Sequence, residues 1–272
     1  MINELNEKHS NVLFFTNQCQ LDCDYCYEKE RICKTEPFFA TLDDFKPTLD
    51  ILAKNDFTND IIVFGGEPTL CMDEIYKTIK YVNNKYPSKF DFYLNTNCIL
   101  FSNNDFFNTF MDFYNNGNKN IIITFSYDGS ANFRRHYKNS DVDTSQNVIK
   151  CISLFTENNI PFNISYCLNI YNYDTCIKDF VYLLQYKALN RIVISKNYNE
   201  LTRYFNLNRD DVDVKINNDI YTKCMYLYDK FNVPICEMTC NVCRKCSKSD
   251  GHVYISPDTC EYKSNMKTFD VF

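Results

Sequence analysis

The chain has 272 residues, 45% of them hydrophobic, with a formal net charge of -6 and a pI near 5.2. This length suits one large α/β domain, with or without a small appendage, and the hydrophobic content suits a packed core. An acidic chain lacks the basic face that neutralises phosphates, so we expect no nucleic-acid partner. The early apolar run from Val12 to Phe15 is too short for a signal peptide or membrane span. We therefore expect a cytoplasmic protein with no membrane partner.

Six β-rich runs alternate with amphipathic stretches, which predicts a parallel sheet wrapped by helices. The expected strands are Asn11 to Thr16, Ile61 to Phe64, Phe90 to Asn95, Ile121 to Ser126, Phe162 to Asn169 and Arg191 to Ser195. The expected helices are Leu42 to Ala53, Met72 to Asn84, Asn104 to Tyr114, Thr144 to Glu157 and Thr175 to Tyr186. The predicted fold is α/β, a partial (β/α)6 TIM-like barrel open on one side, because a full barrel needs about 250 residues before its appendages.

The alternation stops after Ser195. A helical stretch from Asp210 to Phe231 leads into a cluster of cysteines and a short strand from His252 to Ser256. We therefore expect two parts, a barrel core over residues 1–200 and a small cysteine-rich C-terminal extension over residues 201–272.

Cysteine placement is the main clue to function. The count of fifteen is odd and no export signal precedes it, which favours metal binding over disulfides. Cys19, Cys23 and Cys26 closely follow the first strand, at the barrel edge where α/β barrels place their chemistry. Three such thiolates hold a [4Fe-4S] cube when each binds a different iron, which leaves the fourth iron open. In so cysteine-rich a chain this spacing arises by chance about 5% of the time, so a second signal is needed.

Glycines supply that second signal, because the chain has only five of them and some follow predicted strands directly or closely. Gly65 and Gly66 directly follow the second strand, and Gly129 closely follows the fourth. Glycine at a strand end marks either an ordinary strand-to-helix turn or the close approach of a ligand to the backbone. Three chemically distinctive loops on one face of the barrel favour the ligand.

These motifs resemble those of the radical S-adenosylmethionine (SAM) enzymes. The cysteines fit the CxxxCxΦC signature of that family, with Tyr25 as the aromatic residue, and Gly65 to Pro68 match its GGEP loop. The turn from Ser126 to Gly129 resembles the SxDG element of the peptide-modifying branch. The segment from Leu94 to Cys98 resembles its TNG element, with Cys98 in place of glycine.

The resemblance implies a SAM site as well as a cluster. It implies SAM contacts from Tyr25, Gly65, Gly66, Glu67, Pro68, Asn95, Thr96, Ser126 and Asp128. In that branch an Arg binds the SAM carboxylate, and Arg134 and Arg135 are the nearest candidates; the alternative is that both are solvated loop residues.

A second group of cysteines lies near the C-terminus, at positions 236, 240, 243, 246 and 260. The hairpin from Gly251 to Cys260 resembles those of SPASM and twitch extensions, which hold auxiliary [4Fe-4S] clusters. Four thiolates also suit structural zinc, and the sequence does not separate the two metals. Our preferred ligands for a second cluster are Cys240, Cys243, Cys246 and Cys260, with Cys236 as a substitute.

The resemblance implies an enzyme that cleaves SAM to a 5′-deoxyadenosyl radical and removes a hydrogen atom from a peptide or protein. The product would be a crosslink, an oxidation or an epimer, and the electron donor a flavodoxin or ferredoxin. Two alternatives stay open, a small-molecule dehydrogenase and a non-catalytic metal-binding or regulatory protein. The catalytic acid or base is unassigned, because Tyr and Asp residues are too numerous to select one.

Overall fold

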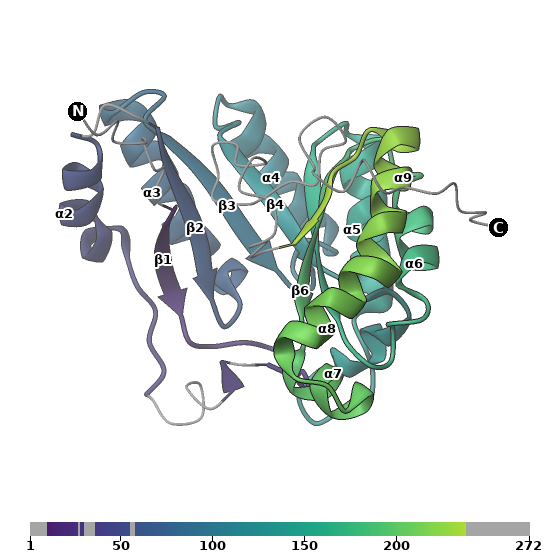
Figure 1. The fold of residues 1–272 in the computed structure, drawn as a ribbon. Coiled ribbons are helices and arrows are strands. Elements are labelled where there is room, and N and C mark those ends of the chain that lie inside the picture. The colour runs from purple at the N-terminus through teal and green to yellow at the C-terminus, as the bar shows by residue number, and fades with distance from the viewer. Residues whose placement is uncertain (1–9, 27, 30–35, 55–57, 238–272) are drawn as a thin grey trace, which may run out of the picture.

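The computed structural model describes residues 10–26, 28–29, 36–54 and 58–237, and seven strands in them form one sheet (Figure 1). The strands are β1 (Ser10–Thr16), β2 (Asn59–Gly65), β3 (Phe90–Thr96), β4 (Ile121–Ser126), β5 (Phe162–Leu168), β6 (Leu189–Lys196) and β7 (Ile235–Glu237). All neighbours are parallel and follow chain order. The first six confirm the predicted strands to within a residue or two, and with them the α/β partial barrel.

Helices connect the successive strands and cover one face of the sheet (Figure 1). They are α2 (Leu42–Leu52), α3 (Met72–Lys85), α4 (Asn104–Asn115), α5 (Ser145–Glu157) and α6 (Cys176–Leu183), with two 3-10 turns, η1 (Pro68–Cys71) and η2 (Gly129–Arg134). In α3 the apolar residues Met72, Ile75, Ile79 and Val82 recur at helical spacing and are buried against the sheet. All five helices confirm the predicted ones.

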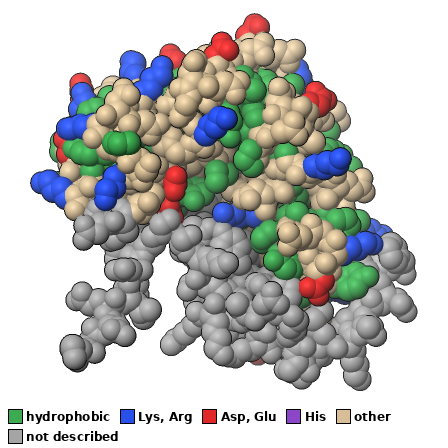
Figure 2. Space-filling model, turned by 90° about the horizontal axis from the view of Figure 1, so that it is seen from above, with side chains coloured by type: hydrophobic (Ala, Val, Ile, Leu, Met, Phe, Trp, Pro, Cys, Tyr) green, Lys and Arg blue, Asp and Glu red, His purple; other side chains and the backbone are tan. Residues whose placement is uncertain are grey.

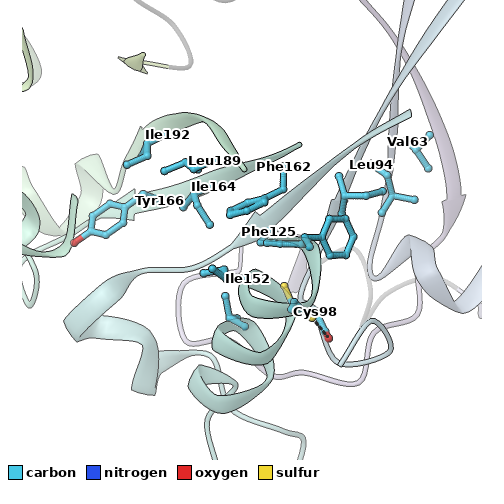
Figure 3. Close-up of a cluster of buried hydrophobic side chains, with 14 of the residues drawn as sticks. Val63, Leu94, Cys98, Phe125, Ile152, Phe162, Ile164, Tyr166, Leu189 and Ile192 are labelled. Carbon is cyan, nitrogen blue, oxygen red and sulfur yellow. Dashed lines mark hydrogen bonds between the residues drawn. The ribbon is translucent and has the colours of Figure 1, made fainter. Parts of the chain in front are cut away.

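The core lies between the helices and one face of the sheet. Strand β3 shows the reason, because Phe90, Phe92 and Leu94 are buried while the residues between them are only half-buried. Leu94, Phe125 and Phe162 lie side by side in this core, over Ile152 of α5 (Figure 3). The opposite face of the sheet carries the alternate residues, which include Asn95 and Ser126.

The chain after β6 continues the same core. Its elements are α7 (Tyr198–Phe205), α8 (Arg209–Ile216), the π-helical turn η3 (Asn217–Tyr221), α9 (Thr222–Phe231) and β7. The sequence predicts the helical stretch of α8 to α9 but neither α7 nor β7. Leu201, Val212 and Ile235 belong to the buried cluster, so the described residues after 200 pack on the barrel. The domain boundary at residue 200 stays a prediction, since 238–272 lie outside the described residues.

The described part of the chain contains no helix that is long and apolar enough to cross a membrane. On the face seen in Figure 2, Lys and Arg side chains are spread among acidic and uncharged residues and form no basic stripe.

Candidate functional site

Three cysteines lie in the loop that leaves the carboxyl end of β1, which we call the cysteine loop (residues 17–26). Cys19, Cys23 and Cys26 are each half-buried. Figure 1 shows this loop running beneath the sheet toward α7, along the edge where the parallel strands end. Two other segments hold it there, one on each side.

The first segment is the glycine loop (residues 65–69) after β2. Gly66 and Glu67 donate backbone hydrogen bonds to the carbonyl oxygens of Thr16 and Gln18, each at 2.7 Å. A Cβ on Gly65 would collide with the Thr16 carbonyl, and one on Gly66 would collide with that of Gln18. The glycines are therefore required by the close approach of the chain's own cysteine loop, whether or not a ligand also binds there.

The second segment is the arginine segment (residues 127–138) after β4. It pairs with the second half of the cysteine loop through backbone hydrogen bonds from Asp22 to His136 at 3.0 Å and from Asp24 to Arg134 at 3.1 Å. Leu21 and Tyr137 form an antiparallel bridge between them. The cysteine loop is thus fixed along both edges by backbone bonds.

Glu67 is a buried carboxylate that joins two neighbouring segments, with 1% of the residue exposed. Its Oε1 accepts hydrogen bonds from the Thr69 hydroxyl at 2.6 Å and the Thr96 hydroxyl at 2.8 Å, and its Oε2 accepts one from the Asn97 backbone at 2.7 Å. Burial raises the pKa of Glu67, and these bonds oppose that rise. The carboxylate therefore ties the glycine loop to the end of β3.

The Cys19 thiol accepts two N–H···S contacts. The donors are the backbone of Leu21, with nitrogen and sulfur 3.4 Å apart, and the side-chain amide of Asn97, with Nδ2 and Sγ 3.7 Å apart. Burial, followed by the nearby Glu67 carboxylate, raises the pKa of Cys19 to about 12. Burial also raises the pKa of Cys23. Both groups stay protonated at neutral pH until a metal displaces the proton.

Asp128, which is fully buried, and Arg135, whose side chain is 11% exposed, form a charged pair beside the cysteines. Arg135 Nη1 lies 3.8 Å from Asp128 Oδ2, and Tyr25 bonds to both, donating its hydroxyl to Asp128 and accepting from Arg135 at 3.0 Å. Cys167 of β5 donates its backbone N–H to Asp128 Oδ1 at 2.9 Å. Burial raises the pKa of Asp128 to about 6, against the lowering effect of Arg135. The Nε of Arg135 is buried and has no hydrogen-bond partner among the residues that the structure describes.

Arg134 points away from that pair toward α7. Its Nη1 and Nη2 donate to the two carboxylate oxygens of Glu200, at 2.9 and 2.6 Å. Its guanidinium carbon lies 5.0 Å from the ring centroids of both Tyr25 and Tyr171. The two predicted arginines therefore differ, because Arg134 binds Glu200 while Arg135 lies against the cysteine loop and its Nε is unpartnered within the described part of the chain.

Comparison with known proteins decides the family. Residues 13–181 match the model of the Radical SAM superfamily. The chain belongs to the radical SAM superfamily. Radical SAM cyclopropyl synthase TigE from Paramaledivibacter caminithermalis is 24% identical over 220 residues, which are 75% of this chain and 44% of TigE. The chain thus matches less than half the length of that relative.

Two solved structures share the fold of this radical SAM chain. The anSMEcpe structure with bound AdoMet and the Kp18Cys peptide has a TM-score of 0.64 at 18% identity, covering 82% of this chain and 62% of that one. SuiB from Streptococcus suis, bound to precursor peptide SuiA, has a TM-score of 0.61 at 16% identity, covering 89% and 53%.

The cysteine loop of this radical SAM chain fits an iron–sulfur cube. Among the described residues, no three His, Cys, Asp or Glu side chains could hold a single metal ion. Three thiolates hold a [4Fe-4S] cube when each binds a different iron, and they then leave the fourth iron for an outside ligand. The donor set, three thiols at the carboxyl edge of a parallel sheet, thus agrees with the predicted cluster.

The second predicted metal site is not described. Of its five cysteines only the backbone of Cys236 is placed, in β7 opposite Val193. Cys240, Cys243, Cys246 and Cys260 lie outside the described residues, as does the expected strand from His252 to Ser256. The second cluster and its zinc alternative stay predictions.

Other predicted SAM-site residues of the radical SAM chain lie at neighbouring strand ends. Asn95 and Ser126 are half-buried on the sheet face away from the helices, and Pro68 begins the turn η1. Thr96 bonds to Glu67, and Cys98 has φ 72, a backbone conformation that explains why glycine suits this position in the family motif. Their contacts with SAM stay predictions.

Sequence reasoning missed two residues of this site. Asn97 lies inside the quoted TNG-like segment, but nothing in a sequence shows that its amide reaches Cys19. Glu200 lies in α7, which the sequence analysis does not predict. The one local signal is Asn197, a residue type favoured at helix N-caps, which in the structure accepts a hydrogen bond from the backbone N–H of Glu200.

Proposed function

We propose that this chain cleaves SAM reductively and abstracts a hydrogen atom from a peptide or protein, with Cys19, Cys23 and Cys26 as ligands of a [4Fe-4S] cluster. The observation that carries the proposal is the placement of these half-buried thiols beside the guanidinium of Arg135, whose side chain is 11% exposed, within a radical SAM fold. Thiols beside a guanidinium whose Nε has no partner among the described residues suit a ligand that binds iron at one end and carries a carboxylate.

When bound, the cluster supplies one electron to SAM, whose C–S bond then breaks to give the 5′-deoxyadenosyl radical that removes the substrate hydrogen. The protein's own contribution is position and charge. The glycine loop and the arginine segment fix the cysteine loop along both edges, so the thiols are held in place before SAM binds.

Arg135 is the better partner for the SAM carboxylate. Both terminal nitrogens of Arg134 already bind Glu200, whereas the buried Nε of Arg135 has no partner in residues 10–26, 28–29, 36–54 and 58–237. The remaining pocket residues in the proposal are Tyr25, Gly65, Gly66, Glu67, Pro68, Asn95, Thr96, Ser126 and Asp128. Since Glu67 already accepts several hydrogen bonds, its role in this proposal is chiefly to hold the loops around SAM.

A peptide substrate is supported by the fold neighbours. anSMEcpe and SuiB are described with bound peptides, and TigE is named as a cyclopropyl synthase. The described sheet also leaves β1 and β7 unpaired with each other, so the barrel is open between them. We propose a crosslink, an oxidation or an epimerisation as the outcome, with a flavodoxin or ferredoxin as electron donor and the cytoplasm as location.

The first experiment tests the cluster and SAM cleavage. The full chain is reconstituted with iron and sulfide without oxygen, mixed with SAM and a reductant, and assayed for 5′-deoxyadenosine. A fully loaded protein that neither binds nor cleaves SAM would reject the proposal in favour of a non-catalytic metal-binding protein. In a triple Ala variant of Cys19, Cys23 and Cys26, about four remaining irons would support an auxiliary cluster, and zinc alone would reject it.

The second experiment tests the assignment of the two arginines. We expect Arg135→Gln to weaken SAM binding at least about tenfold, the loss typical of one charge-assisted contact. Arg134→Gln is the matched control, since it removes the same charge one residue away and should change SAM affinity less than about threefold. Equal losses in the two variants would contradict the assignment.

The third experiment tests the substrate class. Peptides encoded beside the gene are synthesised with deuterium at carbon, and the 5′-deoxyadenosine is analysed by mass spectrometry. Transfer of deuterium from a peptide supports the proposal. SAM cleavage with deuterium transferred only from small molecules of a cell extract would favour the small-molecule alternative.

A further inference from the structure

We infer that Asn97 sets the reduction potential of the cluster by donating a side-chain N–H···S hydrogen bond to Cys19. The inference deepens the proposed function and rests on it, because it takes Cys19 as a cluster ligand. Asn97 acts through Cys19 and is therefore a positioning residue, with no contact to substrate required.

The orientation of the Asn97 amide is fixed by its other bonds. Its Oδ1 accepts a hydrogen bond from the Ile99 backbone at 3.0 Å, so the oxygen is on that side and the NH₂ group is on the other. Nδ2 then lies 3.7 Å from Cys19 Sγ and 3.3 Å from Gln20 Oε1. One amide hydrogen therefore points to the sulfur and the second to Gln20.

The backbone holds Asn97 in that place. Its own N–H donates to Glu67 Oε2 at 2.7 Å, and 4% of the residue is exposed. A buried amide with all of these partners cannot turn away from the sulfur without leaving a polar group unpaired, which costs about 1–3 kcal/mol. The contact to Cys19 is thus built in by the loop after β3.

The expected effect on the cluster follows from charge. Reduction adds one negative charge, part of which resides on the thiolate sulfurs, and an N–H dipole pointed at a sulfur stabilises that charge. The Glu67 carboxylate, whose Oε2 accepts the Asn97 backbone N–H at 2.7 Å, acts in the opposite direction because a nearby negative charge disfavours adding another. The Asn97 side chain donates to Cys19 and its backbone donates to Glu67. Without the side-chain donor, the repulsion between the Glu67 carboxylate and the added charge is no longer offset at Cys19, so reduction of the cluster should become harder.

Two variants test the inference in the full reconstituted chain. Asn97→Ala removes the donor, and Asn97→Asp keeps an oxygen for Ile99 while replacing the NH₂ group by an acceptor. EPR-monitored redox titration without SAM gives the midpoint potential. For Asn97→Ala we expect reduction to be about three- to tenfold less favourable, which is about 28 to 59 mV at 59 mV per tenfold for one electron. Asn97→Asp should shift it further in the same direction.

The matched control is Asn103→Asp, the same substitution at the N-cap of α4. Asn103 accepts hydrogen bonds there from the backbones of Asp105 and Phe106, and an Asp does this equally well. Its potential should stay at the wild-type value. Iron and sulfide counts confirm equal loading, and an unchanged potential in fully loaded Asn97→Ala overturns the inference while leaving the proposed function intact.

A second measurement uses only wild-type protein, so altered folding of a variant cannot affect its result. Wild-type protein labelled with 15N-asparagine is examined by ENDOR on the reduced cluster. We expect a 15N coupling that the unlabelled protein lacks, and its absence overturns the inference. Failure of the wild-type chain to assemble a cluster that depends on Cys19 would overturn the proposed function and this inference together.

Discussion

The two sides of the cysteine loop are held by different forces. On the glycine side, Gly65 and Gly66 leave no room for a Cβ, and the carboxylate of Glu67 is bonded by neutral donors. On the arginine side, the described contacts join Arg134, Arg135 and His136 to Asp24, Asp128 and Glu200. Beyond the backbone hydrogen bonds that both sides make, shape therefore fixes one side and charge fixes the other, so the first should respond to added volume and the second to pH.

The largest expected effect is on the glycine side. Gly66→Ala places a methyl group against the Gln18 carbonyl, so the two backbones must separate and their hydrogen bonds stretch. We expect the free energy of unfolding to fall by about 2–4 kcal/mol and cluster loading to drop. Urea denaturation of the metal-free protein and iron counts after reconstitution measure the two effects.

Gly117→Ala is the control for that change. Gly117 has φ +92 and nothing within 4 Å of an added Cβ, so Ala there costs only backbone strain, about 1–2 kcal/mol, and leaves the iron count unchanged. If Gly66→Ala were no more destabilising than Gly117→Ala, steric control of the glycine side would be wrong.

The next effect tests charge on the arginine side through Asp128. Its pKa is raised by burial to about 6 from an ordinary 3.8, so the native state takes up a proton at higher pH than the unfolded chain. Stability contributed by this group therefore rises as pH falls from about 7 to about 4.5. Relative to Asp128→Asn, the wild-type free energy of unfolding should rise by about 2 kcal/mol over that range, at 1.36 kcal/mol per pKa unit.

Chemical denaturation of the metal-free proteins at several pH values measures this difference. Asp141→Asn changes an exposed carboxyl and should show no comparable rise. A wild-type advantage that shrinks on acidification would mean that Arg135 outweighs burial at Asp128.

The contrast between the two sides also explains what the sequence predicts and what it does not. Strand and helix periodicity depends on local residues, so β1 to β6 and α2 to α5 are predicted within a residue or two, and α6 ends three residues before its predicted end. The cysteines and glycines are recognisable because their spacing along the chain is itself the signal. β7 is not predicted because its three residues, Ile235–Glu237, are too few to show the alternation of apolar and polar residues that marks a strand.

Contacts between residues that are far apart in the sequence cannot be predicted from either segment alone. The amide of Asn97 meets Cys19 across 78 positions in the sequence, and Arg134 meets Glu200 across 66. The sequence leaves Arg134 and Arg135 equivalent, because both are arginines in one loop. Only the placement of Glu200 on α7 separates their roles.

A smaller effect is expected at the Arg134–Glu200 pair. Glu200→Gln removes the charge that faces a guanidinium with 6% side-chain exposure, while Glu200 itself is 23% exposed and partly solvated. We expect a loss of about 1–2 kcal/mol in the free energy of unfolding, less than for a fully buried pair. Asp43→Asn breaks the exposed pair with Lys46 and should cost no more than about 0.5 kcal/mol. Equal costs in the two variants would mean that the Arg134–Glu200 ion pair does not help to hold the arginine side.

The smallest expected effect is at His136, on the outer rim of the arginine side. A hydrogen bond to Asp24, whose Oδ1 lies 3.2 Å from Nε2, raises the pKa of His136. A raised pKa in the folded state means stability that is present below about pH 6.5 and is lost as pH rises through the folded value. Relative to His136→Gln, the wild type should gain a few tenths of a kcal/mol at pH 6 and nothing at pH 8.5, because both side chains are partly solvated. The gain should also fall in 1 M salt, where screening is strong, whereas the cost of Gly66→Ala should not. A His136 effect that grew with pH, or that ignored salt, would show that this side too is held by shape.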